Sequence, residues 1–150
     1  MKPLIVLFSV FVLSLAIIYM AAGGVNYIFA GQIALSIMMF FTAIGHFKFP
    51  KGMSRMIPDF VPYKLPLVYF TGCIEIAAAI GLQIPALRAL TGWMLILFFL
   101  IILPANINAA IKHLNYETGS YDGKGLSYLW FRVPMQVLLI VWTYLFAINL

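Results

Sequence analysis

The sequence predicts an all-α polytopic transmembrane helical bundle, and three observations carry this prediction. Of the 150 residues, 65% are hydrophobic and only 9% are charged, whereas soluble domains have roughly 25% charged residues. The mean hydropathy is +1.07. Apolar segments alternate with short polar ones, and each apolar segment approaches the roughly 20 residues that a helix needs to cross a bilayer. A chain of this kind forms a single transmembrane domain, residues 1–150, and leaves no room for a soluble one.

We predict four helices of one bundle preceded by an extra N-terminal helix, which makes five spans. Their approximate ranges are 3–22, 31–47, 66–82, 90–111 and 127–148. The first segment follows Lys2 and also fits the start of a secretory signal, but its apolar run is longer than a signal core. We therefore interpret it as a retained helix. Pro104 and Pro134 lie inside apolar runs, where membrane helices tolerate kinks.

The distribution of basic residues predicts the orientation in the membrane. With five spans, Lys2 and the loops 48–65 and 112–126 share one side, and they hold all Lys and Arg outside the helices except Arg88. Such loops stay in the cytoplasm, so we expect a cytoplasmic N-terminus and an extracytoplasmic C-terminus in the cell (inner) membrane. Anionic lipid headgroups account for the net charge of +5, and nucleic acid is excluded as a partner.

The connection at residues 48–65 is unusual for a loop. Pro50, Pro58 and Pro62 break any long helix there, whereas Met53 and Met56 are too apolar for a solvated segment. Two interpretations stay open: an interfacial amphipathic segment, or a cap that dips into the bundle.

One carboxylate, Glu75, lies near the middle of the span at 66–82. At the rise of an α-helix it is about 14 Å in from Pro66, close to the bilayer midplane. A carboxylate there costs at least a few kcal/mol unless it is neutral, paired or facing a wet cavity. We therefore expect other polar side chains to meet Glu75.

Further polar side chains occur in the same half of the predicted bundle. Arg132 and Gln136 are four residues apart and share a helix face, whereas Asn106 and Asn108 are two apart, so at most one of them faces the same centre. The predicted polar layer consists of His46, Glu75, Asn106, Arg132 and Gln136. Two interpretations are left open: the layer lines an intramembrane cavity, or it is structural and holds the helices together through a Glu75–Arg132 pair.

Several classes of site are excluded or disfavoured. The only cysteine, Cys73, rules out a disulfide framework and a thiolate cluster, and we expect a thiol packed in the core. A single His in the layer argues against a metal site. Small residues at Gly72 and at 77–81 favour self-association into a homo-oligomer or binding to a membrane protein partner. No hydrolase motif, phosphate loop or dinucleotide fingerprint occurs, so we expect no enzyme activity of the chain by itself.

Five motifs in order resemble the DoxX-like family of small bacterial membrane proteins. They are FFTAIGHF, IPDFVPYKLPLVYFTGCIEI, a proline-bounded turn with Arg88, LPANINAAI and WFRVPMQ, and the resemblance runs from about residue 33 to residue 148, about three-quarters of the chain. The resemblance implies a four-helix unit and a part in redox-associated membrane complexes, as an oxidoreductase component if any chemistry is involved. The first helix departs from this pattern, and the chain lacks the cysteine pair of a redox relay.

We expect the chain to bind a small lipophilic molecule, a quinone-like compound or a lipid, in a polar pocket around Glu75 and Arg132. No cofactor is required by the sequence. The other candidate is a non-catalytic membrane chaperone or accessory subunit whose polar layer is structural. Two observations discriminate between these candidates: a pocket that reaches Glu75 would favour binding, whereas a dry, closed Glu75–Arg132 contact without a cavity would favour the structural interpretation.

Overall fold

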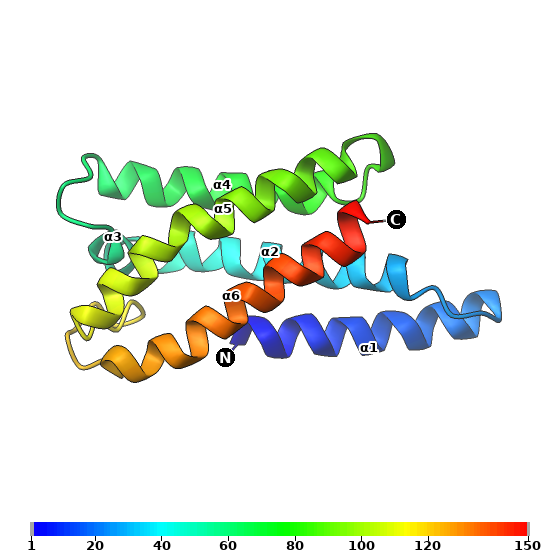
Figure 1. Cartoon of the computed structure of the whole chain (residues 1–150), viewed down its shortest axis with the longest axis horizontal. Helices are drawn as coiled ribbons and strands as arrows, with labels where there is room; N and C mark the ends of the chain where they lie inside the picture. Colours follow the sequence, from blue (N-terminus) through cyan, green and yellow to red (C-terminus); the bar gives the residue numbers. More distant parts are fainter. Residues whose placement is uncertain (1, 150) are drawn as a thin grey trace.

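Five long helices run alternately in opposite directions along one axis (Figure 1). The structure is a computed structural model that describes residues 2–149. The helices are α1 (Lys2–Ala22), α2 (Tyr27–Lys48), α3 (Pro50–Met56), α4 (Lys64–Gly81), α5 (Pro85–Ile111) and α6 (Leu129–Thr143), with the 3-10 turn η1 (Gly125–Tyr128) before α6 and the π-helical turn η2 (Tyr144–Ile148) after it. All but α3 are long and apolar enough to cross a membrane, counting α6 with its flanking turns. The predicted all-α class with five spans is confirmed.

Local chemistry sets the helix boundaries. The Asn26 side chain accepts a hydrogen bond of 2.9 Å from the Phe29 N–H and caps the start of α2, a few residues earlier than predicted. Helix α5 also begins earlier than predicted, at Pro85, because proline fits the first helical position, where its missing N–H is not needed. In the first turn of α5, Arg88 Nε donates to the Leu82 carbonyl at 3.0 Å and closes the turn from α4 to α5.

Helix α2 is the most covered of the spans, and α1 is the least covered. In the most apolar 18-residue stretch of α2, 50% of the residues are buried, compared with 11% in the corresponding stretch of α1. Leu35, Met38 and Met39 of α2 form the centre of the core, together with side chains of α4, α5 and α6. Helix α1 lies on the flank of this unit: its Leu7 is fully buried in the same core, and its Phe8 and Phe11 rings pack edge-on against Trp142. The bundle is therefore four helices with one N-terminal helix added on its flank.

The connection after α2 forms a cap on one end of the bundle. It contains the short helix α3, where Gly52 and Met56 are buried. Met56 packs with Ala109 and Leu114, and its carbonyl accepts a hydrogen bond of 2.7 Å from the Asn108 side chain. Of the two interpretations of this segment, the cap is the one that the packing supports.

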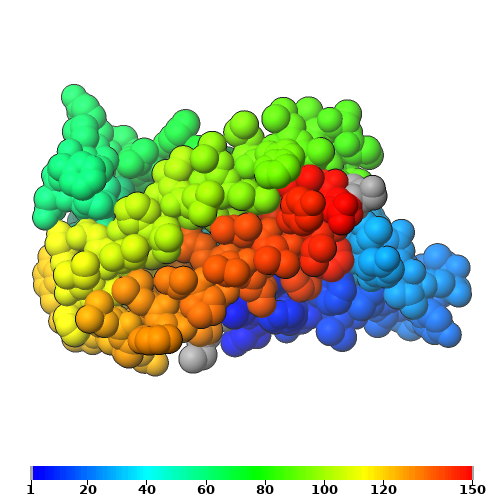
Figure 2. All heavy atoms as spheres, in the orientation of Figure 1, coloured from blue at the N-terminus to red at the C-terminus, as the bar shows by residue number. Residues whose placement is uncertain are grey.

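The basic segments gather at that same end, which we call the basic end. Lys2 at the start of α1 forms an ion pair of 2.7 Å with Glu117. Asp59 is paired with Lys64 at 2.7 Å and with Lys112 at 2.9 Å. Three segments that the sequence places on one side of the membrane are thus joined directly. Figure 2 shows that the opposite end is uneven, because the junction of α1 and α2 extends beyond the other helix ends.

One expectation about α4 is wrong. Cys73 is exposed rather than packed in the core, because it lies about 200° around the helix from the buried Glu75 and so faces outward. The small residues Gly72 and Gly81 are buried within the chain, where they contact His46 and Thr91. Their lack of side chains lets α4 approach its neighbours inside the chain.

Candidate functional site

Glu75 faces the interior of the bundle and is only 5% exposed. Its helix also buries Val68, Gly72 and Ala79, which lie on the same side at helical spacing. Side chains in an α-helix point toward its N-terminus, and the N-terminus of α4 lies at the basic end. The carboxylate therefore reaches back from the middle of α4 toward the last turn of α2.

The partner of Glu75 is His46, with His46 Nε2 3.4 Å from Glu75 Oε1. Gly72 allows this approach, because a Cβ atom at that position would lie only 2.8 Å from His46 Cβ. The imidazole is held from its other side, where His46 Nδ1 lies 3.0 Å from the Val68 carbonyl oxygen and 3.1 Å from Thr71 Oγ1. The hydroxyl of Thr71 itself donates to the Val68 carbonyl at 2.8 Å.

These contacts indicate the tautomer of His46. A carbonyl oxygen only accepts hydrogen bonds, so His46 Nδ1 carries a hydrogen and donates it to Val68. In a neutral imidazole the second nitrogen, Nε2, is then an acceptor, and it faces another acceptor, Glu75 Oε1. A proton on either of these two atoms would convert their repulsion into an attraction and leave the pair without net charge.

Two acceptor atoms in this half of the bundle have no partner. Within residues 2–149, the fully covered side-chain oxygens without a hydrogen bond are Glu75 Oε2 and Gln136 Oε1. Gln136 uses its Nε2 group to donate to the Phe99 carbonyl. Because that carbonyl accepts only, the amide orientation is determined and its oxygen points elsewhere. An unpaired buried polar group costs about 1–3 kcal/mol, so both oxygens are sites where a donor would be bound favourably.

The predicted pairing of Glu75 with Arg132 is wrong. The guanidinium of Arg132 donates from Nε to the Tyr128 hydroxyl and lies 4.9 Å from the centre of the Tyr128 ring. Across the described residues 2–149, the ion pair that Glu75 forms is with His46. The reason is the order of the helices: α4 packs closely against α2, so the imidazole is nearer to the carboxylate than a side chain from the first turn of α6.

The two asparagines behave as their spacing predicts. Asn106 is 6% exposed and faces the interior, whereas Asn108 is half-buried and donates to α3 as described above. Gln136 is also 6% exposed and bonds a carbonyl of α5 close to Pro104, whose missing N–H loosens that stretch of helix. The structure brings His46 and Glu75 together, turns Asn106 and Gln136 inward, and leaves Arg132 with Tyr128.

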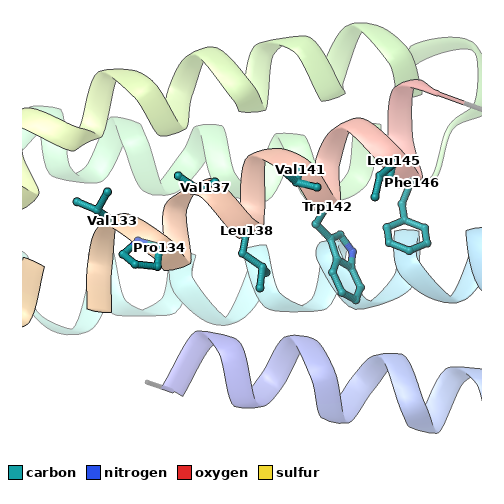
Figure 3. A pocket seen from close by; sticks show the side chains of 8 residues that line it. All are labelled: Val133, Pro134, Val137, Leu138, Val141, Trp142, Leu145 and Phe146. Carbon is teal, nitrogen blue, oxygen red and sulfur yellow. The ribbon is translucent and has the colours of Figure 1, made fainter. Parts of the chain in front are cut away.

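An apolar groove of about 510 Å³ runs along α6, but it is not at Glu75. Figure 3 shows its lining along one side of that helix, with Trp142 and Phe146 pointing toward α1. The lining residues are Val133, Pro134, Val137, Leu138, Val141, Trp142, Leu145 and Phe146. None of the polar side chains predicted for the site lines it. In the part of the chain that the structure describes, no three His, Cys, Asp or Glu side chains gather as metal ligands.

Sequence reasoning missed the role of Thr71 and of the Val68 carbonyl. Thr71 lies four residues before Glu75 and Gly72 three residues before it, so both share its helix face. This Thr-Gly-x-x-Glu spacing is the signal that could have identified a helix face that contacts a histidine. The backbone carbonyl of Val68 leaves no trace in the sequence.

A second polar cluster at the opposite end was not predicted either. Gln32 donates to the Phe146 carbonyl at 2.9 Å, and Trp142 Nε1 donates to the Gly31 carbonyl at 3.1 Å. Gln83 donates to Ser36 Oγ at 2.7 Å and to the Gln32 carbonyl at 3.2 Å. We call this cluster the Gln32 network. It ties α2 to the turn after α4 and to the end of the chain.

The architecture and the buried His46–Glu75 pair define a class, a small helical bundle of the multi-pass membrane type. Within that class, residues 35–147 match the family described as a domain of unknown function, DUF8561. The chain belongs to this family. The match begins inside α2 and leaves out α1, in agreement with the position of α1 on the flank of the bundle. No curated protein and no solved structure matches the chain.

Proposed function

We propose that the protein binds a small lipophilic molecule, a quinone-like compound or a lipid, at a polar site inside the bundle formed by His46 and Glu75 with Asn106 and Gln136. The observation that carries the proposal is the pair of covered, unpartnered oxygens, Glu75 Oε2 and Gln136 Oε1. A bundle selected only for stability has no reason to keep them, because apolar side chains of similar volume would avoid their cost.

The position of the site supports a lipophilic partner. Ionisable groups within membrane spans are costly and commonly mark substrate or ion pathways. His46 and Glu75 belong to two of the candidate spans. A lipophilic molecule is already dissolved in the bilayer at the level of this pair, so it does not have to pass through water to reach it. In this proposal Arg132 no longer compensates Glu75, but it remains available near the basic end for the polar part of a longer head group.

The cellular setting is part of the proposal. The gathering of basic residues at one end favours a cytoplasmic basic end under the positive-inside rule, with the N-terminus inside and the C-terminus outside. The resemblance to the DoxX-like family favours a bacterial inner membrane and a part in a redox-associated membrane complex. It adds no catalytic residue, and we assign none.

A second candidate function is that of a non-catalytic chaperone or accessory subunit in the membrane. It is favoured by the polar side chains that bond the backbone of neighbouring segments, Gln136 to Phe99 and Asn108 to Met56. In that case the polar layer only fixes the helices relative to one another, and the partner of the protein is another membrane protein.

Native mass spectrometry of the purified protein tests the proposal. The wild type should carry a small lipophilic molecule, and the double variant His46→Leu/Glu75→Leu should lose it. Replacing both members of a buried pair by apolar residues is often neutral or stabilising, so this variant is expected to fold. Gln83→Leu is the control, because it changes a polar side chain at the opposite end. If the double variant keeps the molecule, or if the wild type carries none, the binding proposal is wrong and the accessory role is favoured.

A further inference from the structure

We infer that the basic end carries a second binding site, where Arg132 and Lys48 hold the phosphate of an anionic phospholipid head group. This inference goes beyond the proposed function, because none of the contacts that support it involves His46 or Glu75. It follows from the way the charges at the basic end are matched and from the hydrogen-bond donors that Arg132 leaves free.

The chain has four acidic side chains, and each of them is already engaged within the protein. Their partners are Lys64 and Lys112 for Asp59, His46 for Glu75, Lys2 for Glu117, and the Ser120 hydroxyl for Asp122. Across residues 2–149, neither Lys48 nor Arg132 forms an ion pair with a carboxylate. An anion that matches these two cations must therefore come from another molecule.

Arg132 presents a free pair of donor groups. In the described part of the chain, its Nε donates to the Tyr128 hydroxyl, and its two terminal nitrogens have no hydrogen-bond partner. The fully covered side-chain atoms without a partner are Glu75 Oε2 and Gln136 Oε1, so the terminal nitrogens of Arg132 are open to the surroundings. Two such nitrogens in one plane form the fork that binds two oxygens of one phosphate.

A row of aromatic rings connects Arg132 to Lys48. The guanidinium lies 4.9 Å from the centre of the Tyr128 ring, and Lys48 Nζ lies 5.4 Å from the centre of the Phe49 ring. The ring centres of Phe49 and Tyr116 are 6.4 Å apart, in an edge-on arrangement. Burial raises the pKa of the Tyr116 hydroxyl, Tyr128 acts in the same direction, and the charge of Arg132 opposes this rise. Tyr116 therefore lies between the two cations.

One carboxylate, Glu117, borders this row of rings. The hydrogen bond from Lys2 lowers the pKa of Glu117, and the charge of Lys48 adds a smaller effect in the same direction. Lys2 also opposes the rise in the pKa of Tyr116. We call this group, Lys2, Lys48, Glu117 and Arg132 with the rings between them, the cationic corner. Its three cations face one carboxylate, which leaves an excess of positive charge.

The position of the cationic corner favours a lipid as the source of the phosphate. Arg132 lies in the first turn of α6, within a candidate span that begins at Gly125. The neighbouring Trp130 is 86% exposed, as is typical of the aromatic side chains that lie at the level of the lipid head groups. Basic side chains gathered between helices at this level bind anionic head groups. A phospholipid places its phosphate there while its acyl chains stay beside the apolar spans.

Native mass spectrometry with a matched pair of lipids tests this inference. The purified full chain in detergent micelles is mixed with equal amounts of phosphatidylglycerol and phosphatidylcholine that carry the same acyl chains. Both lipids contain a phosphate, but only phosphatidylglycerol has a net negative charge. We expect the wild type to retain phosphatidylglycerol in preference to phosphatidylcholine.

Two variants that lose one positive charge assign this preference to Arg132. Arg132→Gln should reduce the ratio of retained phosphatidylglycerol to phosphatidylcholine by about tenfold or more, as expected when hydrogen bonds between charged groups are lost. Lys64→Gln is the matched control. It removes the same charge from the same end, but Lys64 is already paired with Asp59, so the ratio should stay close to that of the wild type.

A third variant tests the site by strengthening it. Glu117→Gln removes the carboxylate from the cationic corner and frees Lys2, so it should raise the ratio severalfold. Because the Glu117 side chain is 37% exposed, this substitution is expected to leave the fold intact, and the test does not depend on the folding of Arg132→Gln.

Equal retention of the two lipids by the wild type, an equal loss in Arg132→Gln and Lys64→Gln, or a lower ratio in Glu117→Gln would overturn the inference. Release of phosphatidylglycerol by an equal concentration of inorganic phosphate would overturn the assignment to a lipid. The variant His46→Leu/Glu75→Leu should keep the preference, so failure of this inference is distinguishable from failure of the proposed function.

Discussion

The bundle contains two polar clusters between its helices that differ in how completely the hydrogen bonds of their covered atoms are formed. In the Gln32 network, at the opposite end, the side chains of Gln32, Gln83 and Trp142 each donate to an oxygen of a neighbouring segment. In the half nearer the basic end, Glu75 and Gln136 each keep a covered oxygen without a partner. Low-dielectric surroundings make satisfied networks rigid and unsatisfied ones costly. The difference favours a structural role for the first cluster and is consistent with the ligand site proposed for the second.

The largest expected effect concerns the satisfied cluster. Gln32→Leu removes the donor to the Phe146 carbonyl and should lower the free energy of unfolding by about 1–3 kcal/mol, since it leaves a partly buried carbonyl without its donor. Gln136→Leu is the matched change in the other cluster, and it should cost less, because it also removes an unpaired oxygen. Unfolding in mixed micelles with increasing SDS measures both. An equal or larger loss for Gln136→Leu would contradict the distinction between the clusters.

A smaller effect is expected at the close approach of α2 and α4. Gly72→Ala places a methyl group 2.8 Å from His46 Cβ and should lower the free energy of unfolding by about 1–2 kcal/mol, after allowing for the better helix propensity of alanine. It should also weaken ligand retention by moving the imidazole away from Glu75.

Gly45→Ala is the control for that substitution. Its new methyl group would lie 3.2 Å from the flexible end of Met53, which can move aside, so stability should be unchanged or raised by up to about 1 kcal/mol. If both substitutions behave alike in the same unfolding assay, the close approach at Gly72 is not what positions His46.

The smallest effect is expected at the exposed charges of the basic end. Hydrogen bonds from Lys64 and then Lys112 lower the pKa of Asp59 from its usual value of 3.8 to about 2. Because the pKa is lower in the folded protein, the pairs stabilise it above about pH 4, and this contribution is lost as the pH falls from about 4 through about 2. Asp59→Asn should remove this pH dependence of the melting temperature between about pH 4 and about pH 2. It should not change the difference in stability between the Gln32→Leu and Gln136→Leu variants.

Salt provides the check on this last prediction. The carboxylate is largely exposed, so the difference between wild type and Asp59→Asn should shrink as the salt concentration rises. A difference that persists in high salt would show that Asp59 acts through packing.

The sequence was sufficient for the class of fold and for the burial of Glu75, because both depend on composition and helical periodicity. It was not sufficient for the partner of Glu75. The pairing with His46 instead of Arg132 depends on which helices are adjacent around the bundle, and that order is set by packing at positions such as Gly72. Likewise, the outward position of Cys73 follows only once the buried side of α4 is known.

The cap formed by α3 and its neighbours has a consequence for access. It buries Met56 and Leu114 at the basic end, whereas the side chain of His46 remains 16% exposed. We expect the proposed ligand to reach His46 from the lipid acyl chains and not from the aqueous phase, because the cap covers the basic end. Partitioning into the bilayer would then select the ligand before binding, because only molecules soluble in the lipid chains would reach Glu75.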